Sequence, residues 1–207
     1  MAYFEELARV GNPSALHKSG RLARSVVEDA RERMAAALGA HPTEVVWTSG
    51  GTEADNLALK GLYWARHGAD ARRTRIVTTA IEHHAGLDPA HWLEAEHGAT
   101  AVVLPVDGEG RVDVDALRAE VAAHFDEIAL VSVMWANNEV GTIQPIREIV
   151  NVATEHDIPV HADAVQAVGH VPVDFRGSGL ATMAVSAHKF GGPVGVGALV
   201  ARRDLTI

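Results

Sequence analysis

The chain of 207 residues contains no cysteine. This absence excludes disulfide bonds and metal sites built from thiolates, although it does not fix the cellular compartment. The chain also lacks a long hydrophobic run: the longest, at 128–136, has nine residues, whereas a transmembrane helix needs about 20. The first ten residues include two glutamates and no apolar core of a secretory signal. We therefore expect a cytoplasmic protein that does not cross a membrane.

Basic residues are in the minority, with 18 Lys and Arg against 27 Asp and Glu and a net charge of −9. This balance argues against non-specific binding of nucleic acid, which needs a basic face to neutralise phosphates. A small anionic ligand is not excluded, because it needs only a few local donors. The apolar content of 47% is typical of a soluble globular protein, and the length suits one domain with a substantial core.

Helix-like and strand-like segments alternate along the chain. Apolar residues three to four apart predict a helix that follows the turn at 12–14 and stops at Gly39. Short β-rich runs separated by helical segments are typical of βα units and a largely parallel sheet. The predicted strands lie at 44–48, 75–79, 100–104, 128–133, 158–162 and 182–187, and the further helices at 53–67, 86–97, 113–124 and 145–156.

Polar residues follow five of these strands directly. The segments are SGGTEADN after the first strand, AIEHHAG after the second, MWANNEVGT after the fourth, DAVQAVG after the fifth and HK at the end of the sixth. Ligands of open α/β sheets bind beyond the carboxyl ends of the strands. The sequence therefore predicts one site assembled from five strand ends.

Glycines between a strand and a helix, as in TSGGTE (48–53), allow close backbone approach, and the free N–H groups of a helix start attract phosphate. The simpler interpretation is a turn in which Thr52 caps the helix. Asp163 follows a strand that reads as buried, where a carboxylate needs a cation such as a protonated ring nitrogen, or several donors. Alternatively, Asp163 has no ligand and simply closes a turn through a hydrogen bond.

His83 and His84 end another strand, where an imidazole can stack on a flat ring or move a proton. We predict no metal site, because ligand spacings such as H-E-x-x-H are absent. Asn137 and Asn138 could simply form a turn. Lys189 stands among small residues, where desolvation would make its amine nucleophilic. A lysine, a phosphate-binding turn, a carboxylate and an imidazole together suit pyridoxal 5′-phosphate (PLP).

The motifs resemble those of cysteine desulfurases, which are PLP enzymes of the class-V aminotransferase group with fold type I. They are TSGGTEADNLALKG, IEHHAG, VSVMWANNEVGT, HADAVQAVG and SAHKFGGPVGVGAL, and they span about 11–203 in the family's order. The resemblance implies a three-layer α/β/α fold with a mostly parallel central sheet, like the large domain of PLP-dependent transferases. Residues 11–207 would form this PLP-binding domain, and 1–10 a divergent N-terminal segment.

The resemblance also implies roles at the cofactor ring. Lys189 would bind the cofactor covalently and move the α-proton of the substrate. Asp163 would keep the ring nitrogen protonated, and Gln166 would hydrogen-bond the ring hydroxyl. His83 would stack on the ring and assist proton transfer, while Asn138 would lie beside the ring and the substrate carboxylate.

The phosphate of the cofactor would be bound by Thr52 and the backbone of Gly51, together with Ser186 and His188. The implied substrate is L-cysteine, which becomes L-alanine while its sulfur passes to the enzyme as a persulfide, for iron–sulfur cluster assembly or thio-modification. The family also implies a homodimer, and a sulfur-acceptor or scaffold protein as a further partner.

The chain departs from the family pattern because it contains no cysteine to attack the substrate sulfur. In the family that cysteine lies in a small C-terminal domain, which we expect to be absent here, so we expect this chain alone to be inactive. A fragment, a truncated gene product and a protein that works with another chain all remain open. So do two other functions: a class-V enzyme such as a selenocysteine lyase or an aminotransferase, and a non-catalytic dimerisation or scaffold module.

Overall fold

The computed structural model describes residues 11–207, so the predicted N-terminal segment 1–10 lies outside the described residues. One sheet of seven strands, in the order β1-β7-β6-β5-β4-β2-β3, organises this part of the chain. β7 is antiparallel to both of its neighbours, whereas the pairs among β2 to β6 are parallel. The strands are β1 (Val45–Thr48), β2 (Arg75–Thr79), β3 (Thr100–Leu104), β4 (Ile128–Met134), β5 (Val160–Asp163), β6 (Thr182–Ser186) and β7 (Gly197–Ala201).

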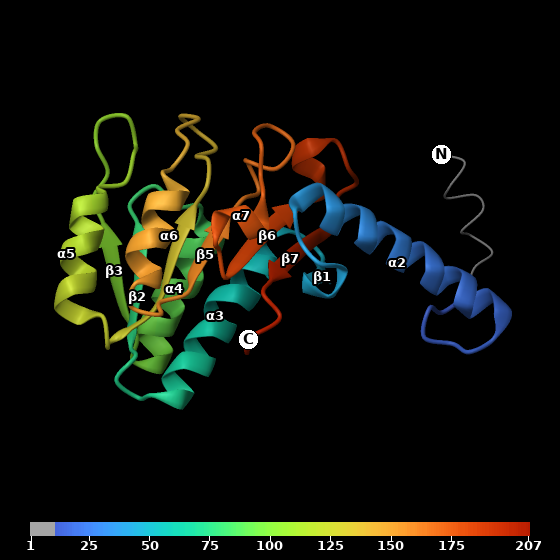
Figure 1. Cartoon of the computed structure of the whole chain (residues 1–207), viewed down its shortest axis with the longest axis horizontal. Helices are drawn as coiled ribbons and strands as arrows, with labels where there is room; N and C mark the ends of the chain where they lie inside the picture. The colour runs from blue at the N-terminus through green and yellow to red at the C-terminus, as the bar shows by residue number, and fades with distance from the viewer. Residues whose placement is uncertain (1–10) are drawn as a thin grey trace.

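Helices cover both faces of this sheet (Figure 1). On one face, α3 (Gly51–Ala69) crosses β4 to β7 and packs against α4 (His84–His97). The other face is covered by α5 (Val114–His124) and α6 (Ile146–Thr154), with the short α7 (Phe175–Ser178) against α6. The predicted α/β/α fold with a mostly parallel sheet is confirmed.

The first described helix, α2 (Lys18–Leu38), extends away from the sheet (Figure 1). The side chain of His17 caps its start by accepting a hydrogen bond from the backbone N–H of Gly20. Gly39 ends it in the left-handed conformation that favours glycine, with a φ of 67°, so the predicted stop is confirmed. No helix within residues 11–207 combines the length and apolarity that crossing a bilayer requires.

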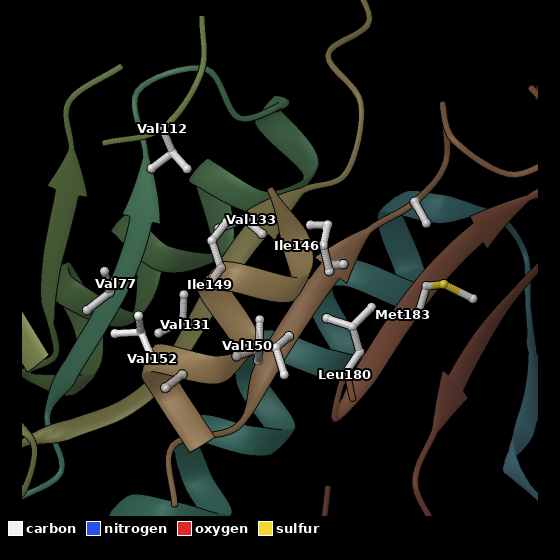
Figure 2. Close-up of a cluster of buried hydrophobic side chains, with 14 of the residues drawn as sticks. Val77, Val112, Val131, Val133, Ile146, Ile149, Val150, Val152, Leu180 and Met183 are labelled. Carbon is white, nitrogen blue, oxygen red and sulfur yellow. The ribbon is translucent and has the colours of Figure 1, made fainter. Parts of the chain in front are cut away.

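The largest hydrophobic cluster lies between the sheet and α6 (Figure 2). All seven residues of β4 are buried, because helices cover this central strand on both sides, which explains its continuous apolar run. Val131 and Val133 face the α6 cluster that includes Ile149, while Leu130 belongs to the cluster beneath α3 and α4. Each fully buried Val, Leu or Ile side chain contributes about 1.5–3 kcal/mol to the free energy of folding.

The sequence did not predict β7, which lies between the edge strand β1 and β6 and is antiparallel to both. It follows the glycine-rich stretch 191–197, and its residues are all buried between β1 and β6. This stretch belongs to the motif SAHKFGGPVGVGAL, which we assign to the site on the resemblance. Two short 3₁₀ turns, η1 (Pro42–Glu44) and η2 (Ala187–Phe190), complete the elements. Because η2 follows the end of β6 directly, its residues lie at the carboxyl edge of the sheet.

Candidate functional site

A cavity of about 240 Å³ lies at the carboxyl edge of the sheet, where β2, β4, β5 and β6 end and α3 begins. Its walls come from all five strand ends that the sequence singled out. The nine predicted site residues all line it: Gly51, Thr52, His83, Asn138, Asp163, Gln166, Ser186, His188 and Lys189. The structure therefore brings together residues that span 51 to 189, while their individual roles stay predictions.

One end of the cavity is formed by the first turn of α3. The helix begins at Gly51, and its N-cap is Gly50, which offers no side-chain hydrogen bond. Thr52 is therefore not the cap, so that simpler interpretation is wrong. Glu53 accepts hydrogen bonds from the backbone and the hydroxyl of Ser49, which lower the pKa of its carboxyl. The first N–H groups of α3 remain a suitable place for an anion.

Close packing holds this turn against the end of β5. A Cβ atom on Gly51 would lie 2.5 Å from Cγ2 of Val165, so a side chain there would displace its neighbour. Ser186 lies beside the same turn, with its Cβ 3.6 Å from a Cβ built on Gly51, and its Oγ is 3.0 Å from Nδ1 of His188. Backbone N–H groups, the hydroxyls of Thr52 and Ser186 and an imidazole thus surround one end of the cavity, a donor set that suits a phosphate.

Asp163, the last residue of β5, forms the other end. Its side chain is buried, and Oδ1 accepts a hydrogen bond of 2.9 Å from the backbone N–H of Val165. Burial raises the pKa of Asp163 to about 7, and the negative charge of Asp55 adds to this, whereas His161 and His83 lower it. A positive charge in the cavity would stabilise the ionised carboxylate, so Asp163 is suited to hold a protonated ring nitrogen.

Two further buried carboxyls flank Asp163. Burial raises the pKa of Glu82 to about 8, although Oε1 accepts a hydrogen bond of 2.5 Å from the hydroxyl of Thr79. Burial also raises the pKa of Asp55 to about 8. We name Asp55, Glu82 and Asp163 the carboxyl floor. Because no Lys or Arg side chain is buried with them among residues 11–207, ionisation of the floor would favour a cationic ligand.

The structure distinguishes the two adjacent histidines. His83 lines the cavity and is the N-cap of α4, with Nδ1 accepting a 3.0 Å hydrogen bond from the backbone N–H of Ala85. In the neutral ring, the proton is therefore on Nε2. His84 is exposed and lies 3.1 Å from Asp88 one helical turn further on. The first histidine of the pair is thus the one at the site.

The two asparagines also differ. Asn137 is buried and stabilises its turn by donating to the carbonyl of Ile81 and accepting from the N–H groups of Glu139 and Val140. Neither asparagine has a positive φ, and the left-handed position of this turn is taken by Gly141, with a φ of 77°. Asn138 lines the cavity, and its amide is available to a bound ligand.

Lys189 lies in η2 and contributes to the cavity wall, but its side chain is exposed. Our expectation that its small neighbours would desolvate it is therefore wrong for this chain. The glycines that follow it belong to the stretch 191–196, which is itself largely exposed, so small residues there do not form a cover. Lys189 therefore lies on the exposed side of the cavity, whereas Asp55 and Asp163, which also line it, are buried.

Sequence reasoning missed Asp55 and His161. Oδ1 of Asp55 lies 3.1 Å from Nε2 of His161, and both side chains are 1% exposed. Asp55 lies on the same helix face as Ala58, Leu59 and Leu62, all buried, so a carboxylate within an apolar stripe was the available signal. His161 occupies an inward position of a short apolar strand, two residues before Asp163, which was the corresponding signal.

We name the first turn of α3 with Thr52, Ser186 and His188 the anion cup. An open α/β sheet with such a cup, buried carboxyls and an accessible lysine at its carboxyl edge is typical of cofactor-dependent α/β enzymes. The comparison with known proteins defines the family. The chain belongs to the family Aminotransferase class-V, whose model matches residues 2–206.

The similar proteins are cysteine desulfurases. The chain is 58% identical over 197 residues to an IscS-like cysteine desulfurase of Mycobacterium tuberculosis, covering 95% of this chain and 50% of that protein. It is 48% identical to the cysteine desulfurase IscS of Dictyoglomus turgidum, covering 96% of this chain and 49% of that protein. The chain thus spans about half the length of the curated relatives it matches.

Solved structures agree with this assignment. A NifS-like protein superposes with a TM-score of 0.89 at 36% identity, covering 100% of this chain and 55% of that one. SspA in complex with cysteine gives a TM-score of 0.86, also at 36% identity, covering 93% of this chain and 54% of that one. The expected class-V membership and the expected similarity to cysteine desulfurases are confirmed.

Proposed function

We propose that this chain is the cofactor-binding domain of a PLP-dependent cysteine desulfurase. The proposed reaction converts L-cysteine to L-alanine and passes the sulfur to the enzyme as a persulfide, for iron–sulfur cluster assembly or thio-modification. The observation that supports this most strongly is that one cavity joins an anion cup at Gly51 to a carboxylate at Asp163, with Lys189 at its mouth.

The residues present suit PLP. The first turn of α3 with Thr52, Ser186 and His188 would hold the phosphate, and the buried Asp163 would hold the ring nitrogen in its protonated form. Gln166 would donate to the ring hydroxyl. Each polar group of the cofactor thus has a partner of suitable chemistry in a cavity where a side chain at Gly51 would clash.

When bound, PLP supplies an electron sink for the negative charge that develops at the substrate Cα. Lys189, which would attach the cofactor, would also take the proton from that carbon, and its exposure leaves the amine free to move. His83 presents its Nε2 proton to the cavity because Nδ1 is used in capping α4. Asn138 would orient the substrate carboxylate.

The sulfur-accepting thiol must come from polypeptide other than these 207 residues, because they contain no cysteine. We propose a homodimer as the working assembly, in the cytoplasm, with a sulfur-acceptor protein as a further partner. Large apolar side chains near the site are exposed, including Val140 at 67% and Val194 at 81%, which supports self-association. Light scattering on the purified chain would detect the dimer.

The first test is covalent attachment of the cofactor. The chain has three lysines, Lys18, Lys60 and Lys189, so the attachment site can be mapped without ambiguity. We expect the chain incubated with PLP to develop a visible absorbance band, and borohydride reduction followed by peptide mass spectrometry to place the adduct on Lys189. Lys189→Arg should abolish the adduct.

Lys60→Arg is the matched control, because this amine lies over the ring of Trp92 on the outer surface, 4.2 Å from its centroid. This variant should react like the parent chain. An adduct distributed over Lys18 and Lys60, or one that persists in Lys189→Arg, would refute the assignment. Cysteine-to-alanine turnover by the chain alone should stay near background.

A further inference from the structure

A chain of polar contacts runs behind the cavity, through the interior of the domain. Asp55 Oδ1 lies 3.1 Å from His161 Nε2, and His161 Nδ1 lies 2.9 Å from Thr182 Oγ1. The three residues are buried and come from α3, β5 and β6. Asp55 also lines the cavity, so it connects these interior contacts to the site.

The bonding of Asp55 indicates which form of its carboxyl the fold accommodates. Oδ2 is buried without a hydrogen-bond partner among the described residues. An ionised carboxylate in that position would be costly, whereas a protonated carboxyl can donate to Nε2 of a neutral imidazole. Burial favours the uncharged form of both groups, because it raises the pKa of Asp55 to about 8 and lowers the pKa of His161 to about 4.

The pair is close to Asp163 because of the strand geometry. His161 and Asp163 are two residues apart on β5, so both side chains project from the same face of the sheet, towards α3. A negative charge on Asp55 raises the pKa of Asp163. The other titratable groups that face Asp163 are Glu82 and His83, between β2 and α4, and Lys189 in η2.

We propose that Asp55 and His161 are positioning residues: Asp55 is uncharged in the free protein and becomes a second negative charge beneath Asp163 when a cation binds there. Before a ligand binds, the carboxyl of Asp55 is protonated, and its O–H group donates a hydrogen bond to Nε2 of His161. When a cationic ring binds at Asp163, its positive charge favours ionisation of Asp55: the O–H bond breaks, the proton passes to solvent, and the electron pair stays on the carboxylate. The second negative charge then strengthens binding of the ring. This inference rests on the proposed function, because the cation is the protonated ring nitrogen of PLP.

The test counts the protons released when PLP binds, by calorimetry in buffers of different ionisation enthalpy. Asp55→Asn keeps the shape of the side chain but cannot ionise. At about pH 7, the parent chain should release up to about one proton more per site than Asp55→Asn. The difference should vanish below about pH 5 and above about pH 9, where Asp55 no longer changes state. A purely structural role would weaken binding without this dependence on pH.

Asp88→Asn is the control, because its carboxylate is 71% exposed on α4; its proton release should equal that of the parent. Equal proton release by the parent and Asp55→Asn over the whole pH range would overturn the proposal. If Asp55→Asn fails to fold, His161→Gln serves instead. Its amide N–H can donate to Asp55 and stabilise the charged form, so proton release at about pH 7 should fall.

A second measurement separates this inference from the proposed function. Carbon-13 NMR of the aspartate carboxyls in the cofactor-free protein should show Asp55 ionising at about pH 8, and at lower pH in His161→Gln. Ionisation near pH 4, as in an exposed aspartate, would overturn the inference even if PLP binds. Failure of PLP to bind would overturn the proposed function, and these titrations would still decide whether Asp55 is uncharged.

Discussion

At the Gly51 end the cavity wall consists of backbone N–H groups and hydroxyls, whereas at the Asp163 end it consists of buried carboxyls. The first end is local: Gly51 and Thr52 are neighbours in one helical turn, and their N–H groups need no long-range partner to point outwards. The second end depends on residues far apart in the chain, which only become acidic neighbours when α3 covers β5. The cup therefore needs few tertiary contacts to form, whereas ionisation of the floor is costly in the free protein and becomes favourable when a cation binds.

The largest expected effect of this difference is on the pH dependence of stability. The pKa values of Asp163, Asp55 and Glu82 are raised to about 7, 8 and 8 in the folded chain. Their contribution to the free energy of unfolding is therefore fully present below about pH 4 and is lost as the pH rises to about 8. The pKa of His161 is lowered to about 4, which opposes this trend only below about pH 6.5.

The free energy of unfolding of the cofactor-free chain should therefore fall between about pH 6.5 and 8, by an amount on the order of a few kcal/mol. Denaturant titrations across this range measure it. Asp55→Asn should flatten the fall, because one ionisation is removed. A stability that rises with pH over this window would mean that the carboxyl floor ionises without cost, and the contrast between the two ends would not hold.

The next largest effect concerns cofactor affinity. Asp163→Asn keeps the size of the side chain but removes its charge, and a hydrogen bond to a charged group contributes about 1.5–3 kcal/mol. The dissociation constant of PLP should rise roughly 10- to 150-fold, as measured by absorbance titration. Asp115→Asn, with a side chain 90% exposed, should leave it unchanged. An unchanged constant in Asp163→Asn would remove this residue from the site.

The smallest effect is expected at the cup, and it should not depend on pH. Gly51→Ala places a methyl group 2.5 Å from Cγ2 of Val165, and such overpacking costs about 1–3 kcal/mol of stability. Val165→Ala removes the clashing methyl, so the double variant should regain much of this loss in a double-mutant cycle. Strictly additive effects would show that the two positions are not in contact.

The sequence predicted the site better than its surroundings. The nine site residues follow strand ends in recognisable motifs, so parallel strands were enough to bring them to one cavity. Strand β7 was missed because its glycine-rich approach reads as a turn, and because its antiparallel pairing with β1 joins residues more than a hundred positions apart along the chain. The exposure of Lys189 was missed because small neighbours indicate close packing only where another element covers them.

What the amino-acid sequence determined by itself is the alternation of strands and helices and the set of polar residues at the strand ends, because these depend on local periodicity and turn chemistry. Which residues become charged neighbours was decided only by the tertiary structure. Asp55 and His161 are 106 positions apart, and neither segment indicates that the other residue is its partner. They form a buried pair because α3 lies across β5, and burial then sets their protonation through the loss of solvent.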